Sequence, residues 1–226
     1  MAMADLKFII DKSGFPLVWV EPIGAFIHWL PVTKVQFEYF LCAVPDSRFD
    51  GAWYEEILRK NPRISPNEIK PDNYWGALLS GIRPGEAQSF VQWLGPEYGL
   101  PTLNEWVKTY QYFKTLPPQS AGIVNQMGEL RERVKTLIGR LNSSSDQAVR
   151  GMGDERRLAD QMLMRMGVME WVECPEHRIH WGGIGQTHPS FHGGLYTPDH
   201  GEPVIPPNPE TDRLYYYGFR LIRREL

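Results

Sequence analysis

The sequence predicts an α+β domain, and three observations support this prediction. Short strand-like segments lie near both ends of the 226-residue chain, at residues 17–29 and 214–222. Helical patterns occupy much of the region between them. The chain also holds 21 glycines, 19 prolines and 8 tryptophans, a composition typical of abundant turns and a core built on large rings. We therefore expect a single α+β domain over residues 1–226.

The first elements are short strands followed by a helix. Residues 17–20 and 25–29 are apolar and aromatic, and turn residues flank them, which indicates a β-meander. Thr33 is suited to cap a helix over residues 34–44, where apolar residues recur at helical spacing until Pro45.

A polar, proline-rich connection is expected over residues 44–82. We expect four rings in it to pack against the domain: Trp53, Tyr54, Tyr74 and Trp75. Arg83-Pro84-Gly85-Glu86 then opens a short helix, whose residues Phe90, Val91, Trp93 and Leu94 are expected to face the core. Thr102 and Glu105 form a capping box at the start of the next helix.

Residues 107–166 are predicted to be a helical insertion. Apolar residues recur every three or four positions over residues 122–141, which indicates an amphipathic helix, and a second helix is expected over residues 155–166. This pair either packs against the domain or provides a surface for self-association over residues 122–166, since methionine-rich faces adapt well to partners.

The last third of the chain contains strands and loops. Residues 168–172 read as a strand, residues 173–213 as a loop-rich region, and residues 214–222 as a closing strand. On a strand, Tyr216 would face away from Tyr215 and Tyr217.

Composition excludes several classes of function. The net charge of −3 disfavours general nucleic-acid binding. No run approaches the ~18 apolar residues of a membrane span, and the N-terminus has no secretion-signal pattern, so we expect a cytoplasmic protein. Cys42 and Cys174 stand too far apart in sequence for a disulfide framework or a paired zinc knuckle.

Four stretches resemble the formylglycine-generating sulfatase-enzyme family. Residues 31–41 (PVTKVQFEYFL) are similar to its PVT segment, and residues 86–106 are similar to its EA…WL…LPTEAEWE segment. Glu170-Trp171-Val172 matches its WEWV, and Gly218-Phe219-Arg220-Leu221 matches its terminal GFRL. The resemblance implies a C-type-lectin-like fold over most of the chain, with a small twisted sheet, two helices beside it and a loop-built face.

The chain also departs from that family. The resemblance implies two cysteines that bind copper near an RGGSW segment, but here residues 178–185 read RIHWGGIG and no cysteine follows them. A soft copper(I) site needs such thiolates, so formylglycine-generating activity is not expected. Gly167 replaces the family's asparagine, which leaves a family calcium site in doubt.

Alternative chemical sites remain open. Cys174, His177 and His180 could share a metal on a turn. His188, His192 and Asp199 supply the residue types of a nonheme iron site. Ser190 lies between two histidines but lacks the glycines of a nucleophile elbow. Polar loop histidines and a buried cysteine are the simpler interpretation, and we expect no cofactor.

Residues 178–200 are also similar to the variable proteins of diversity-generating retroelements, which have this fold. That resemblance implies a rigid scaffold that displays exchangeable side chains to a protein or small ligand. The predicted ligand face is Trp181, Thr187, His188, Ser190, Phe191, His192, Tyr196 and Tyr216. The sequence therefore predicts a non-catalytic binding protein, and a metal-dependent oxidoreductase of the formylglycine-generating or nonheme-iron type is the alternative.

Overall fold

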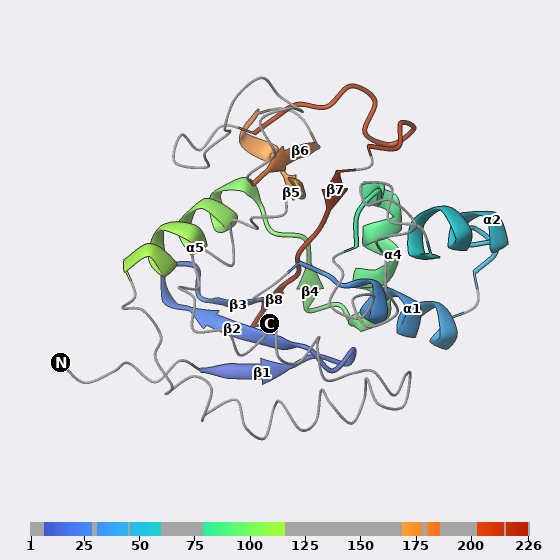
Figure 1. Cartoon of the computed structure of the whole chain (residues 1–226). Coiled ribbons are helices and arrows are strands. Elements are labelled where there is room, and N and C mark those ends of the chain that lie inside the picture. Colours follow the sequence, from blue (N-terminus) through green and yellow to red (C-terminus); the bar gives the residue numbers. More distant parts are fainter. Residues whose placement is uncertain are drawn as a thin grey trace.

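The architecture comes from a computed structural model and is α+β, with two sheets and several helices (Figure 1). The structure describes residues 7–28, 31–44, 46–59, 79–115, 169–177, 180–185, 203–214 and 216–225. The predicted helices over residues 122–141 and 155–166, and the rings of Tyr74 and Trp75, lie outside these ranges. None of the described helices has the length and hydropathy that a membrane crossing requires.

The larger sheet has five strands in the order β1-β2-β3-β8-β4. Its strands are β1 (Phe8–Ile10), β2 (Pro16–Val20), β3 (Ala25–His28), β4 (Tyr98–Gly99) and β8 (Ile222–Arg224). Every neighbouring pair is antiparallel. The expected meander is confirmed, and its third strand pairs with the C-terminal strand, with Ala25 opposite Arg224.

The smaller sheet has three strands in the order β6-β5-β7. They are β5 (Met169–Glu173), β6 (Trp181–Ile184) and β7 (Tyr217–Gly218). Strand β5 is antiparallel to β6 and parallel to β7. The continuous closing strand expected over residues 214–222 is wrong, because β7 belongs to this sheet and β8 to the larger one. The chain between them crosses from one sheet to the other (Figure 1).

The helices begin where the capping residues indicate. The described helices are α1 (Lys34–Ala43), α2 (Gly51–Trp53), α4 (Pro84–Leu94) and α5 (Leu103–Thr115), with a π-helix over Tyr54–Arg59 and single 3-10 turns at Glu21–Ile23 and Pro175–His177. Thr33 caps α1 through a capping box with Gln36. Thr102 does the same for α5, since its hydroxyl accepts from Glu105 N at 3.2 Å and its own N–H donates to the Glu105 carboxylate at 2.7 Å.

An aromatic core joins α1 and α4 to the C-terminal strands. The Phe37 ring lies within 6.4 Å, centroid to centroid, of five other rings, which belong to Phe40, Phe49, Trp53, Phe90 and Phe219. Trp53 is buried, as expected, although the connection that holds it is helical over residues 51–59. Tyr54, which was expected to pack against the domain, is 38% exposed.

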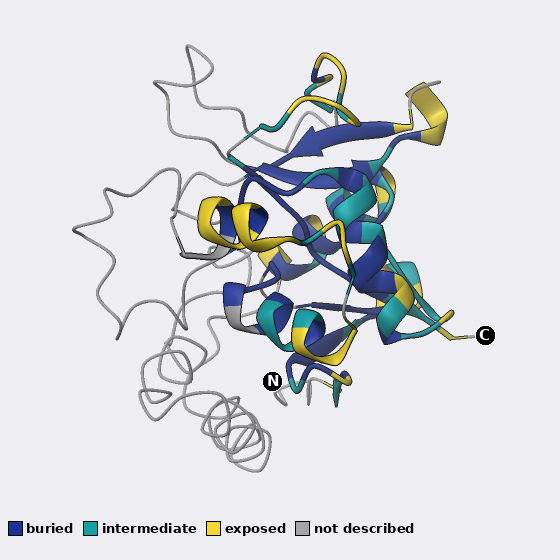
Figure 2. Ribbon diagram, turned by 90° about the vertical axis from the view of Figure 1, so that its right-hand side faces the viewer, coloured by how far each residue is buried: buried dark blue, intermediate teal, exposed yellow. Residues whose placement is uncertain are grey.

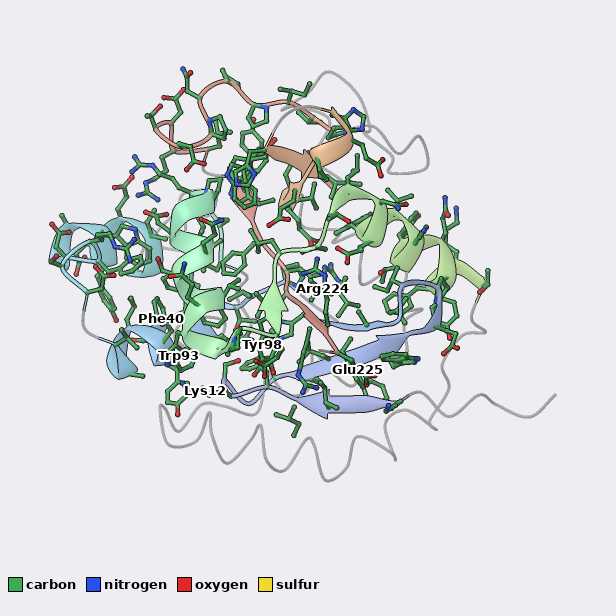
Figure 3. All side chains as sticks on the ribbon, turned by 180° about the vertical axis from the view of Figure 1, so that it is seen from behind. Lys12, Phe40, Trp93, Tyr98, Arg224 and Glu225 are labelled. Atoms are coloured by element: carbon green, nitrogen blue, oxygen red, sulfur yellow. The ribbon has the colours of Figure 1, made fainter. Side chains whose placement is uncertain are left out.

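The turn between β1 and β2 packs against the end of α4. Lys12 Nζ lies 4.6 Å from the centroid of the Trp93 ring and donates to the Trp93 carbonyl at 3.1 Å. Figure 3 shows Lys12, Trp93 and Phe40 gathered at this point. Strands β2 and β3 and the smaller sheet are largely buried, and Figure 2 shows exposed residues concentrated in turns and on the outer faces of helices.

Candidate functional site

The smaller sheet supports the region in which the sequence places the ligand face. Strand β6 lies inside the predicted loop-rich region 173–213, so that region is partly regular. Residue Gly183 of β6 exchanges two backbone hydrogen bonds of 2.8 Å with Val204. Because this bridge joins the chain on both sides of residues 186–202, it closes the base of that segment.

Trp181 is buried at this base rather than displayed on a surface. Trp181 is only 3% exposed, and its indole N–H donates to Glu210 Oε1 at 2.6 Å. The exposed His180 packs its ring 4.2 Å from the Trp181 ring. The expected contact between Trp181 and a ligand stays a prediction, and in this structure the indole is buried with its N–H bonded.

Tyr216 lies at the opposite edge of the smaller sheet. It is half-buried, and this burial raises the pKa of its phenol above the ordinary value. Its ring packs 5.1 Å from Tyr217, and its carbonyl accepts from Met169 N at 2.8 Å. Tyr217 is fully buried against Trp171, with ring centroids 4.1 Å apart. The expectation that Tyr216 faces away from Tyr217 is wrong, because Tyr216 precedes β7 and its ring packs against that of Tyr217.

The remaining residues of the predicted face lie outside the described residues. They are Thr187, His188, Ser190, Phe191, His192 and Tyr196. The same is true of Asp199, the third member of the alternative iron site. The structure thus describes the supports on either side of the predicted face, β6 and residues 203–214, and leaves the face itself as a prediction.

Cys174, His177 and His180 do not converge on one point. Cys174 is buried and its Sγ donates to the Val172 carbonyl at 3.7 Å, whereas both histidines are exposed. Backbone hydrogen bonds account for the turn, since Cys174 N donates to His180 O and His177 N to Cys174 O. Within the described ranges, no group of three or more His, Cys, Asp or Glu side chains is placed to hold a metal ion.

Iodoacetamide at pH 8 is expected to modify Cys42 and to spare Cys174 in the folded protein. Cys42 is exposed, whereas burial raises the pKa of the Cys174 thiol to about 11 and thus suppresses the reactive thiolate. Mass spectrometry should find one modified cysteine before denaturation and two after it. In Cys42→Ser, the folded protein should remain unmodified, and alkylation of Cys174 there would contradict the prediction.

Sequence reasoning missed a buried polar cluster between the β1–β2 turn and α1. Asp11 accepts from the Ser13 hydroxyl at 2.6 Å, and its other carboxylate oxygen lies 2.6 Å from His28 Nε2. Gln36 extends the cluster with a hydrogen bond of 3.1 Å to Ser13. These residues include the three types of a hydrolase triad, but Asp11 lies between Ser13 and His28. The imidazole therefore cannot take the hydroxyl proton, and the cluster is structural.

A second buried polar cluster joins both sheets and α5. Arg220 and Glu170 form a two-armed ion pair with both N···O distances at 2.7 Å. The same carboxylate accepts the Trp106 indole N–H at 3.0 Å, and Arg220 Nη1 donates to the His28 carbonyl at 3.0 Å. Glu170 and Arg220 stand in the motifs Glu-Trp-Val and Gly-Phe-Arg-Leu, but their separation by 50 positions in the sequence hides their pairing.

Comparisons with known proteins do not extend this description. No family model, no curated protein and no solved structure matches the chain.

Proposed function

We propose that this chain is a non-catalytic binding protein that presents residues 186–202 as a ligand face on a C-type-lectin-like scaffold. The observation that carries the proposal is the double backbone hydrogen bond between Gly183 and Val204, which fixes both ends of that segment. A rigid base lets loop side chains change without loss of the fold, which is how many binding proteins combine stability with adaptable loops.

The arrangement of elements supports the lectin-like part of the proposal. Strand β3 near the N-terminus pairs with strand β8 near the C-terminus, and α1 follows β3 directly. A separate three-stranded sheet contains β6, which lies within residues 173–213. A small sheet with helices beside it is what the resemblance to the formylglycine-generating family and to retroelement variable proteins leads one to expect.

The residue types in the segment support ligand binding. Thr187, His188 and Ser190 offer hydrogen bonds, and Phe191 and Tyr196 offer ring surface with few rotatable bonds. Together with His192 and the half-buried Tyr216, they form the proposed contact set. Trp181 is assigned to the support of this face, because its ring is buried and its N–H is already bonded to Glu210.

Alanine at Thr187, His188, Ser190 and Phe191 together is expected to abolish binding and leave the fold intact. Surface loop changes alter stability by about 0.5 kcal/mol or less each, so the melting temperature should shift by a few degrees at most. Loss of a central aromatic contact weakens binding about 30-fold or more. The measurement is binding of the wild type and variant to arrays of immobilised glycans and proteins.

A matched control replaces exposed α5 residues Asn104, Lys108 and Gln111 with alanine and should retain binding. Unfolding of the loop variant, or unchanged binding to the ligands that the wild type selects, would overturn the proposal.

Stoichiometric iron, copper or zinc in the purified protein that is lost in His188→Ala would instead favour the metal-dependent enzyme. A reverse-transcriptase gene beside a near-copy of the 3′ coding region would support the variable-protein assignment.

A further inference from the structure

Glu86, in the first turn of α4, lies where three segments of the chain meet. Its Oε1 accepts the Trp53 indole N–H and Arg213 Nη2, each at 2.8 Å. Its Oε2 accepts Arg213 Nη1 at 3.1 Å and the Arg83 backbone N–H at 2.8 Å. The side chains of Arg213 and Glu86 are only 12% and 14% exposed. Two-armed, charge-assisted hydrogen bonds of this kind are stronger than neutral ones and fix geometry.

Residues 203–214, which we term the strap, are held to the domain at three points. Val204 is bonded to Gly183 at one end, Arg213 to Glu86 and to the Gly81 carbonyl at the other, and Glu210 to the Trp181 indole between them. The middle of the strap is a tight turn, in which the Asn208 carbonyl accepts from the backbone N–H of residues 211 and 212 at 3.1 and 2.9 Å.

The two ends of the strap pack against the core through Val204 and Leu214, and Pro206 is buried, but the rest of the strap contributes little apolar surface to the core. Ile205 is 62% exposed, and most residues from 207 to 212 are exposed as well. A segment with few buried apolar contacts opens locally at low cost unless specific bonds hold it. At two of the three points that hold the strap, a glutamate carboxylate accepts from a side chain: Glu86 from Arg213, and Glu210 from Trp181.

We propose that the ion pair between Glu86 and Arg213, which we term the clasp, keeps the strap docked. We also propose that the Trp53 indole strengthens the clasp by holding the Glu86 carboxylate oxygen that both groups share. The indole N–H and Arg213 Nη2 converge on Oε1, so the indole fixes the carboxylate in the orientation that Arg213 needs. Release of the clasp frees residues 203–214 and leaves both sheets folded. The helical segment 51–59 is thereby coupled to the strap, although more than 140 residues separate them in sequence.

The clasp also bears on the ligand face. The strap begins where residues 186–202 end, so a docked strap sets the position of the face at that end. This consequence rests on the proposed function, whereas the clasp itself is tested without a ligand. If the proposed ligand face fails its test, the clasp is still decided by its own measurement, and the reverse also holds.

Native-state hydrogen exchange followed by mass spectrometry tests the clasp. In Arg213→Ala and Glu86→Gln, the backbone amides of residues 204, 211 and 212 should exchange about ten- to a hundredfold faster, as expected for loss of a hydrogen-bonded charge. The amides of β2 and β3 should keep their wild-type rates. Unchanged rates in the strap, or the same acceleration in β2 and β3, would overturn the proposal.

The role of Trp53 is tested with Trp53→Phe, which keeps a ring in the core and removes the N–H. The strap amides should exchange faster in this variant, but adding it to Arg213→Ala should cause no further change, because both act through one contact. Additive effects would overturn the coupling. The matched control is Trp19→Phe, which loses an equivalent 2.8 Å bond from an indole to Glu21 elsewhere and should leave the strap unchanged.

Discussion

Replacing Glu170 with alanine is expected to lower the free energy of unfolding by about 3–5 kcal/mol, because it leaves a buried charge without its partner. Arg220 is fully buried, and Glu170 is the carboxylate that both arms of its guanidinium contact. The Trp106 indole N–H loses its acceptor in the same variant. For a chain of this size, the melting temperature should fall by roughly 6–20 °C, which urea and thermal denaturation can both measure.

The matched control is Glu97→Ala, which removes a carboxylate from a weaker ion pair. Glu97 and Arg223 are about 30% exposed and 3.8 Å apart, and exposed pairs contribute about 0–1 kcal/mol. If Glu170→Ala and Glu97→Ala lowered the free energy of unfolding equally, the Glu170–Arg220 pair would not join the sheets as the structure indicates.

Gly183→Ala is expected to destabilise the protein by about 1–3 kcal/mol or more through overpacking. A Cβ at this position would lie 2.5 Å from Cε1 and 2.7 Å from Cζ of Tyr217, and closer still to its hydroxyl. The Tyr217 ring cannot retreat easily, since it is fully buried and packs against Trp171. Chemical denaturation of the variant gives the measurement.

The control for this substitution is Gly51→Ala at the start of α2. A Cβ there would meet no heavy atom within 4 Å, so the free energy of unfolding should change by about 0.5 kcal/mol or less. A Gly183→Ala variant as stable as Gly51→Ala would mean that β6 and Tyr217 pack less closely than described.

Local signals in the sequence predicted the helix starts and the first strands. Thr33 and Thr102 cap their helices because a hydroxyl and a Gln or Glu three residues later satisfy backbone groups within one turn. Such contacts depend on neighbours in the chain, so a single sequence contains them. The same holds for the apolar runs of β2 and β3, which turn residues flank.

Contacts between distant segments were not predictable in this way. Residues 214–222 look like one strand, but Arg220 turns toward Glu170 and the chain passes from the smaller to the larger sheet. Alternation of apolar residues does not encode which partner a strand meets. The junction at Glu86 was hidden for the same reason, because Trp53 and Arg213 come from opposite ends of the chain.

The ligand face was inferred from residue types and stays a prediction, since six of its eight residues lie outside the described residues. Trp181 was placed on that face, and the structure shows it buried and hydrogen-bonded to Glu210. Cys174 and the two nearby histidines were candidate ligands by spacing, but spacing along a turn does not fix which side chains point inward.

The position of β8 has a consequence for how the protein acquires its structure during synthesis. Strand β8 lies between β3 and β4 in the larger sheet, although nearly 200 residues separate it from β3. Until residues 222–224 have left the ribosome, β3 and β4 lack their common neighbour. Pairings so distant in sequence slow folding and prolong the exposure of unpaired strand edges. The nascent chain thus holds an open sheet until residues 222–224 emerge, and its need for chaperones should be greatest before that point.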